Sequence, residues 1–206
     1  GSRPIDLHIH GLEKLGATIS LVHGYIKAEA KRLHGAAIEF EKKSVGGTEN
    51  LIMAASLAQG ETVLKNCSLE PEVSDLCELL VKMGAKVDGI GQETIRIKGV
   101  KELGGATHDI IPDRIEAGTF LVAGALTRGN IVLTHSRPHH LDTIIEKLRY
   151  SGAKIEQLNN HSLRVIGSED IKSQDITTSP YPGFPTDMQA QFTILMTQAS
   201  GTSIIT

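Results

Sequence analysis

An internal repeat constrains the fold of this chain more than any other feature of the sequence. A Gly-Ala step recurs at Gly16, Gly84 and Gly152, and the copies lie 68 residues apart. Apolar residues with 3-4-3 spacing precede each step, which predicts one buried face of a helix that ends at the glycine. Two short β-type runs around a turn follow each glycine and predict a β-hairpin.

A second helix is predicted upstream of the first in each repeat. Apolar segments run into a glycine over residues 49–60, 117–129 and 189–201, and a short β-type run follows each of them. The repeating unit is therefore strand, helix, strand, helix, hairpin. One copy extends from about residue 36 to 104 and the next from about 106 to 173. The predicted fold class is α/β, built from these repeated units.

Both ends of the chain interrupt the repeat. The chain opens at the second helix of one unit, stops midway through another, and has no initiator Met. Because a repeat unit cannot bury the apolar face of its helices alone, we expect this chain to be an internal piece of a longer protein.

Composition excludes several classes of protein. With 206 residues and 40% hydrophobic content, the chain can bury a sizeable core, and at 3% aromatic residues that core is aliphatic. No apolar run approaches the roughly 18 residues that cross a membrane, and two cysteines cannot form a disulfide framework. The net charge of -3 and the dispersed Lys and Arg argue against nucleic-acid binding. We expect a soluble, cytoplasmic protein without a membrane or nucleic-acid partner.

Three segments carry candidate functional residues, and the first is Asp6-x-His8-x-His10. On a strand, this pattern resembles the metal motif of the amidohydrolase barrels, because alternate side chains point to one metal ion. The repeat places the segment in a helix instead, where side chains two residues apart diverge by about 200°. A metal-dependent hydrolase using His8 and His10 is therefore the less favoured alternative, and we expect His8 to be partly buried and hydrogen-bonded.

The second segment, residues 42–48, is a strand end that runs through two lysines and small residues into a helix. Free backbone N–H groups at a helix start, a glycine pair and flanking lysines are features of an anion site. An ordinary capped helix start is the simpler interpretation.

The third segment, residues 181–191, also precedes a helix and contains Asp187. Aligned on the repeat, residues 44–48, 113–119 and 186–189 occupy equivalent helix starts, so their polar groups would cluster if the helices pack side by side. Asp187 either caps or charge-stabilises its helix or, in the functional interpretation, is a carboxylate at a cleft that acts as a general base.

Five motifs resemble one enzyme family, in order along the whole chain. They are Arg3-Pro-Ile-Asp-Leu-His8, Lys42-Lys-Ser-Val-Gly46, Leu69-Glu-Pro-Glu-Val73, Pro112-Asp-Arg-Ile-Glu-Ala-Gly-Thr119 and Phe184-Pro-Thr-Asp-Met-Gln-Ala-Gln191. The chain is similar to the UDP-N-acetylglucosamine enolpyruvyl transferases. The sister family, the 5-enolpyruvylshikimate-3-phosphate synthases, shares the fold but is not expected to show the last motif.

The resemblance implies an inside-out α/β barrel of two domains, each of three repeat units, with substrates in the cleft between them. Residues 1–111 would be the later half of one domain and residues 112–206 the first half of the other. The implied reaction transfers the enolpyruvyl group of phosphoenolpyruvate to the 3'-hydroxyl of UDP-N-acetylglucosamine and releases phosphate. It is the first committed step of peptidoglycan synthesis, and no cofactor or metal is expected.

The resemblance also implies site residues. Asp187 would hydrogen-bond the sugar hydroxyl and remove its proton, and Asp113 with Arg114 would lie at the crossing between the domains. Arg3 is suited to bidentate phosphate binding. The residues expected to bind the nucleotide sugar and phosphate are Arg3, Pro4, Ile5, Asp6, Leu7, Lys42, Lys43, Ser44, Val45 and Asp187.

The chain departs from the family pattern in two respects. The family's reactive cysteine, the target of fosfomycin, lies in a Pro-Gly-Gly-Cys type loop before the Arg-Pro-x-Asp-Leu motif, and this chain begins after that loop. Cys67 and Cys77 do not match it, so we expect both to be structural. Lys43 stands where an apolar residue is expected. We therefore expect little turnover from this chain alone, and a non-catalytic, repeat-built binding module is the alternative function.

Overall fold

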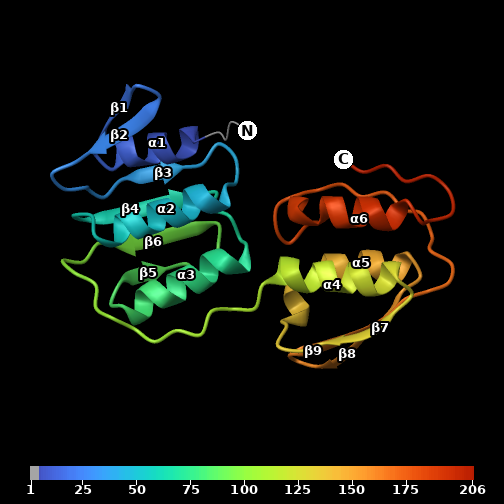
Figure 1. The fold of residues 1–206 in the computed structure, drawn as a ribbon. Helices are drawn as coiled ribbons and strands as arrows, with labels where there is room; N and C mark the ends of the chain where they lie inside the picture. Colours follow the sequence, from blue (N-terminus) through green and yellow to red (C-terminus); the bar gives the residue numbers. More distant parts are fainter. Residues whose placement is uncertain (1–4) are drawn as a thin grey trace. The chain divides into compact units, whose positions relative to one another are not determined.

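The computed structural model describes residues 5–206 and divides the chain into two compact units, residues 1–110 and 111–206. Figure 1 shows helices layered against a sheet in each unit. Each unit has an apolar core of its own. The site residues that the motifs suggest are therefore distributed over two separately packed units.

Within unit 1, the described residues form three helices, a hairpin and a four-stranded sheet. The sheet has the order β3-β4-β6-β5, in which β3 runs parallel to β4 and the other neighbours are antiparallel. The strands β1 and β2 pair with each other as the hairpin. The elements are α1 (Asp6–Lys14), β1 (Thr18–Val22), β2 (Tyr25–Glu29), β3 (Ala37–Glu39), α2 (Val45–Ser56), β4 (Glu61–Lys65), α3 (Pro71–Lys82), β5 (Lys86–Asp88) and β6 (Thr94–Lys98).

The core of unit 1 forms around α2, which packs against α1, α3 and the sheet. Leu51 and Ile52 of α2 are fully buried, as are Leu64 of β4 and Ile97 of β6. Burying an aliphatic side chain of this size contributes about 1.5–3 kcal/mol. This packing holds the start of α2, and with it the lysine segment, next to α1.

Within unit 2, α4 and α5 cover one face of a three-stranded antiparallel sheet of order β7-β9-β8. The last helix, α6, packs against α4 on the side away from the sheet (Figure 1). The elements are α4 (Arg114–Leu126), β7 (Asn130–Leu133), the 3-10 turn η1 (Pro138–His140), α5 (Asp142–Tyr150), β8 (Lys154–Asn159), β9 (Ser162–Ile166), the 3-10 turn η2 (Thr186–Met188) and α6 (Gln189–Met196).

The structure confirms the repeat. Gly16, Gly84 and Gly152 each follow a helix and have φ angles of +95°, +104° and +102°, a left-handed conformation that glycine adopts without a steric penalty. The hairpins predicted after these glycines are β1–β2, β5–β6 and β8–β9. The α/β fold class predicted from the sequence is therefore confirmed.

One predicted strand is wrong. The second repeat was expected to open with a strand near residue 106, equivalent to β3, but residues 101–113 form no strand. β3 is held by parallel pairing with β4, whereas the second segment instead places His108 against α3. Backbone N–H and C=O groups without a neighbouring strand are left to water, so the strand does not form.

The strand expected at residues 203–205 does not form in full. The β-type run at residues 203–205 is reduced to a single bridge between Ile176 and Ile205. Among the helices of residues 5–206, none is long and apolar enough to cross a membrane.

Candidate functional site

The first candidate segment opens α1. Arg3 and Pro4 lie outside the described residues. Ile5 occupies the N-cap position and Asp6 lies in the first helical turn, where a negative charge stabilises the helix dipole. Leu7 is partly buried against the core of unit 1. The exposed face of this helix start therefore presents Ile5 and Asp6.

His8 is hydrogen-bonded rather than placed for a metal. Its Nδ1 lies 2.6 Å from Nδ2 of Asn50, which joins α1 to α2. His10 is exposed two residues further along the same helix, so the two imidazoles diverge. No group of three or more His, Cys, Asp or Glu among residues 5–206 is arranged to hold a metal ion.

The second candidate segment is a capped helix start. Ser44 has an extended backbone, with φ of -144° and ψ of 117°, and its hydroxyl accepts a 3.1 Å hydrogen bond from the backbone N–H of Gly47. A Cβ at Gly47 would approach Ser44 Oγ to 3.0 Å, so the close cap favours glycine there. Val45 is partly buried against the core.

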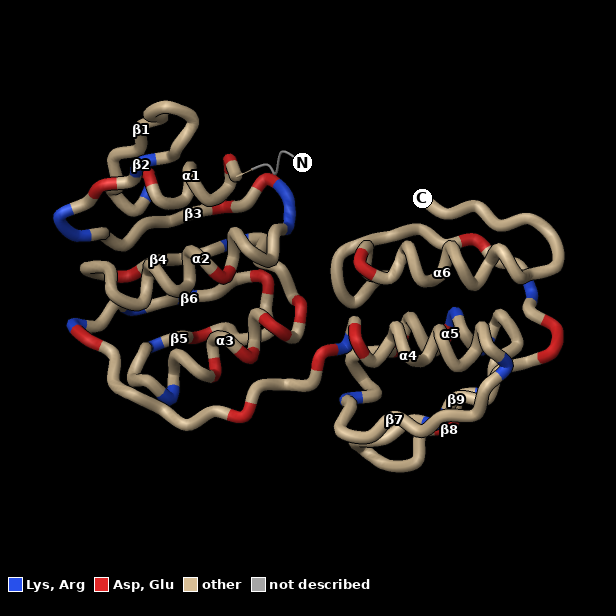
Figure 2. Tube along the Cα trace, in the orientation of Figure 1, with Lys and Arg blue, Asp and Glu red and all other residues tan. Residues whose placement is uncertain are grey.

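The two lysines of this segment have different environments. Lys43 Nζ lies 2.5 Å from a carboxylate oxygen of Glu93, in the turn before β6, and the Lys43 side chain is only 21% exposed. Lys42 is exposed and makes no side-chain hydrogen bond or ion pair within residues 5–206. Figure 2 shows the short basic segment between β3 and α2 adjoining acidic positions along the chain. Only Lys42 therefore offers an uncommitted cation at the start of α2.

Glu49 lies near the start of α2 and has a raised pKa. Burial is the main cause, and the negative charges of Glu72 and Glu70 add to it. Glu70 is buried and immediately precedes α3. Burial and repulsion together favour the protonated form of Glu49.

The third candidate segment, in unit 2, is organised around the starts of α4 and α6. Asp113 is the N-cap of α4, and its carboxylate accepts hydrogen bonds from the N–H groups of Ile115 (2.7 Å) and Glu116 (3.1 Å). Arg114 places its guanidinium 5.6 Å from the ring centroid of Tyr181, a cation–π distance. The first residues of α4 are thus tied to the loop that leads to Asp187.

Asp187 lies in η2 and is exposed. It does not cap its helix, because neither η2 nor α6 has a side-chain cap hydrogen bond, but it is the acidic residue of the first turn, where a negative charge stabilises the helix dipole. Within the described part of the chain its carboxylate has no hydrogen-bonded or ionic partner. The next residue, Met188, is fully buried and anchors the turn.

Sequence reasoning missed the polar contacts that join α4 to α6. The amide Nε2 of Gln191 donates a 2.9 Å hydrogen bond to Thr119 Oγ1, and this hydroxyl donates a 2.8 Å bond to the carbonyl of Ile115. Gln191 was visible as the last residue of the Asp187 motif, but its contact with Thr119 spans 72 residues. The structure brings these two helix starts together, whereas residues 44–48 belong to unit 1.

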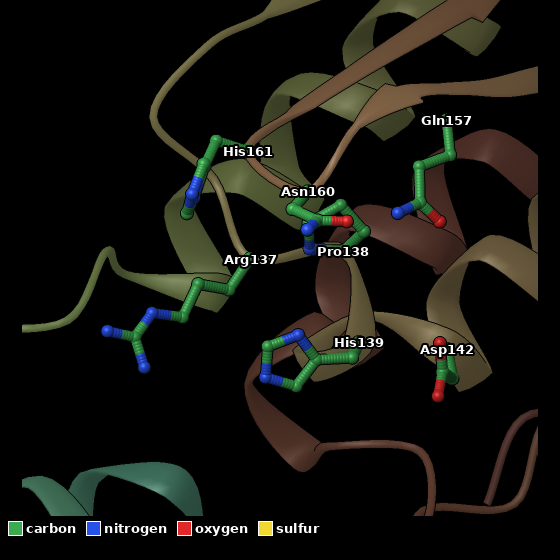
Figure 3. Close-up of a pocket in the computed structure, with 7 residues that line it drawn as sticks. All are labelled: Arg137, Pro138, His139, Asp142, Gln157, Asn160 and His161. Atoms are coloured by element: carbon green, nitrogen blue, oxygen red, sulfur yellow. The ribbon is translucent and has the colours of Figure 1, made fainter.

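A cavity of about 460 Å³ on unit 2 was also not anticipated from the sequence. Figure 3 shows imidazole and amide side chains from the η1 region and the β8–β9 turn around it. Its walls are Arg137, Pro138, His139, Asp142, Gln157, Asn160 and His161. Most of these side chains are exposed, and none belongs to the predicted site.

Both cysteines are buried, which agrees with the structural role expected for them. Burial raises the pKa of Cys67 to about 11 and the pKa of Cys77 to about 12. At neutral pH both groups are therefore protonated thiols and poor nucleophiles.

Comparison with known proteins identifies the family. The profile described as EPSP synthase (3-phosphoshikimate 1-carboxyvinyltransferase) matches residues 1–206. The chain belongs to the EPSP synthase family.

Several relatives of this EPSP synthase family chain resemble it closely. The UDP-N-acetylglucosamine 1-carboxyvinyltransferase of Koribacter versatilis is 58% identical over 205 residues, and that of Acidobacterium capsulatum is 57% identical over 205 residues. Each alignment covers 100% of this chain and 47% of the relative. The chain therefore spans about half the length of the relatives it matches, and the resemblance drawn from the five motifs is confirmed.

Solved structures agree on the EPSP synthase family fold. The enolpyruvyl transferase NikO from Streptomyces tendae gives a TM-score of 0.83 at 20% identity, over 99% of this chain and 52% of that chain. An EPSP synthase from Acinetobacter baumannii gives a TM-score of 0.62 at 21% identity, over 99% of this chain and 48% of that chain. At this level of identity, the likeness shows the fold alone.

Proposed function

We propose that this chain is part of an enzyme that transfers the enolpyruvyl group of phosphoenolpyruvate to the 3'-hydroxyl of UDP-N-acetylglucosamine. The observation that carries the proposal is the 58% identity, over the whole chain, to a protein named for this activity. The enzyme would catalyse the first committed step of peptidoglycan synthesis, in the cytoplasm. Residues 1–111 would be the later half of one domain and residues 112–206 the first half of the other.

The proposed reaction is an addition followed by an elimination. The sugar 3'-oxygen bonds to C2 of phosphoenolpyruvate while a proton is added to its methylene carbon, which gives a tetrahedral intermediate. The resulting methyl group then loses a proton, and the bond between C2 and the phosphate oxygen breaks. These two changes regenerate the double bond and release phosphate. The family's reactive cysteine would protonate the methylene carbon, and the buried thiols of Cys67 and Cys77 do not suit that role.

Asp187 is proposed as the base that takes the proton from the sugar hydroxyl. Its carboxylate is exposed and uncommitted within residues 5–206, while buried Met188 holds the backbone beside it. A general base needs both properties, since it must reach the substrate and must keep its position. Arg114 would support this turn, because its guanidinium lies over the ring of Tyr181, and Asp113 would hold the start of α4 through its cap.

The nucleotide-sugar site is proposed to include the starts of α1 and α2. Arg3, Pro4, Ile5, Asp6 and Leu7 would line the nucleotide and phosphate site, and Lys42, Ser44 and Val45 would contact the nucleotide sugar. Lys42 is supported by its exposed ammonium beside the positive end of α2. Lys43 has the weakest support, because its ammonium is paired with Glu93.

The test is phosphate release by the full-length protein that contains this chain. We expect phosphate only when phosphoenolpyruvate and UDP-N-acetylglucosamine are both present, together with a new enolpyruvyl ether detected by mass spectrometry. Release with shikimate 3-phosphate in place of the nucleotide sugar would assign the protein to the sister activity. Binding of UDP-N-acetylglucosamine without phosphate release would instead support a binding module.

A further inference from the structure

The segment that leads from unit 1 to α4 follows α3. After β6, the backbone N–H of Gly104 donates a 2.8 Å hydrogen bond to the carbonyl of Met83, at the end of α3. Of residues 101–110, only Leu103 and His108 are partly buried, and Ile110 is 79% exposed. The course of this segment along α3 therefore depends on a small number of contacts.

One of these contacts is a side-chain clasp formed by His108, Asp75 and Lys82, in which the His108 and Asp75 side chains are largely buried and Lys82 is exposed. His108 Nε2 lies 2.9 Å from Asp75 Oδ1, and Lys82 Nζ lies 2.9 Å from His108 Nδ1. The side chains of His108 and Asp75 are only 5% and 12% exposed. Asp75 and Lys82 are seven residues apart, so they lie on the same face of α3 and hold the imidazole between them.

The chemistry of the clasp selects one form of the imidazole. The Lys82 ammonium can only donate, so Nδ1 must accept, and the Asp75 carboxylate can only accept, so Nε2 must carry the proton. A neutral imidazole with its proton on Nε2 satisfies both contacts at once. The largely buried Asp75 carboxylate thereby receives a hydrogen bond, which offsets part of the cost of its burial, while Lys82 remains exposed.

We propose that His108 is a positioning residue, which anchors the connecting segment to α3 and confines the adjustable connection between the two units to residues 109–112. Pro112 has a fixed φ angle and also restricts the backbone of Ile111. Asp109 and Ile110 then carry most of the remaining freedom before Asp113 caps α4. The clasp sets where that short connection starts.

The consequence for catalysis rests on the proposed function. Asp187 belongs to unit 2 and the proposed nucleotide-sugar segments belong to unit 1, so transfer by the proposed mechanism would depend on the freedom of residues 109–112. Loss of the clasp would lengthen the free connection back to Gly104. The population of the arrangement competent for transfer would fall, while the packing of each unit would be preserved.

The first test is limited digestion of the full-length protein, wild type and His108→Ala, with endoproteinase Asp-N, which cuts on the N-terminal side of Asp. Asp109 is exposed and directly follows His108, and a protease needs several flanking residues to open before it cuts. Loss of a hydrogen bond to a charged group raises the population of the open segment by about tenfold or more, so cleavage before Asp109 should accelerate by the same factor. Cleavage before Asp170, an exposed residue of unit 2, should not change.

Two further variants make the test specific. Thr107→Ala changes the exposed neighbour of His108 and should leave digestion at the wild-type rate. His108→Gln keeps one donor and one acceptor and should restore part of the protection. Equal cleavage rates for the His108→Ala and Thr107→Ala variants, or an equal acceleration at every site, would overturn the proposal, because a general loss of stability would affect all sites.

Steady-state kinetics provide the functional measurement. We expect His108→Ala to lower kcat/KM for the nucleotide sugar while the melting temperature of the protein changes little, and His108→Gln to recover part of the loss. Unchanged kinetic constants alongside faster cleavage before Asp109 would remove the catalytic consequence. If the wild-type protein shows no transfer at all, the proposed function fails, and the digestion experiment still decides whether the clasp exists.

Discussion

The guanidinium of Arg114 lies 5.6 Å from the ring centroid of Tyr181, which connects the first turn of α4 to the loop before η2. A second contact, from Gln191 to Thr119, joins α4 to α6. Asp187 lies between Tyr181 and Gln191 in the sequence, next to the buried Met188, and is itself exposed. This combination suits a reactive group, and it separates the chemical role of Asp187 from any role in folding.

Replacing Asp187 by Asn in the full-length protein should reduce kcat by roughly 100- to 10,000-fold, the usual contribution of a general base. Stability should change by less than about 0.5 kcal/mol, because the carboxylate has no partner within residues 5–206. The measurements are phosphate release and a urea unfolding curve. Activity at the wild-type level would eliminate Asp187 as the base.

The two lysines before α2 should respond differently to substitution. Lys42→Ala should raise KM for the nucleotide sugar by about tenfold, the effect of losing one charge-assisted hydrogen bond. Lys43→Met is the matched control and should change KM far less, because Lys43 is already paired with Glu93. A larger effect at Lys43 than at Lys42 would show that the Glu93 pair opens when substrate binds.

Asp113 should stabilise the folded protein, because it caps the start of α4. Asp113→Ala removes the acceptor of two backbone N–H groups and should cost about 1 kcal/mol. Asp113→Asn retains an acceptor oxygen and should cost much less. Chemical unfolding of the three proteins checks this order, and equal stabilities of the Ala and Asn variants would argue against the cap.

Cys67 and Cys77 should be unreactive in the folded protein. Their pKa values are raised from 9.0 to about 11 and about 12, so little thiolate is present near neutral pH. Iodoacetamide followed by peptide mapping should label both residues only after unfolding. Because the folded pKa values exceed the unfolded ones, their contribution to stability is complete below about pH 9 and is lost as the pH rises towards 11 and 12.

Glu49 should weaken the fold at neutral pH. Its pKa is raised by burial and by the charges of Glu72 and Glu70, so the folded state prefers its protonated form. The stabilising contribution of that form is present below the unfolded pKa and is lost as the pH rises through the folded pKa. Glu49→Gln should therefore stabilise the protein at pH 7 more than at pH 4.

Urea unfolding at the two pH values checks this prediction. Glu78→Gln, at an exposed position of α3, is the control and should show no such difference between them. An equal change in stability at both pH values for Glu49→Gln would show that the effect does not come from ionisation.

The sequence by itself determined the elements whose signals are local. The apolar spacing predicted the helices, and the glycines at positions 16, 84 and 152 predicted their ends. Both predictions were correct, because the spacing of apolar residues along a helix and the left-handed conformation of a glycine depend only on residues close in the sequence. The alternation around short turns predicted the hairpins for the same reason. The motifs also placed the chain in its family before any geometry was known.

Only the tertiary structure decided which polar groups are committed and which are available. Nothing near Lys43 in the sequence indicates Glu93, and nothing near His108 indicates that Asp75 and Lys82 enclose it. The strand expected near residue 106 also depends on tertiary structure. It does not form, because no neighbouring strand pairs with it. Such contacts join residues 26 to 50 positions apart, so they exist only once the apolar faces have packed and brought those side chains together.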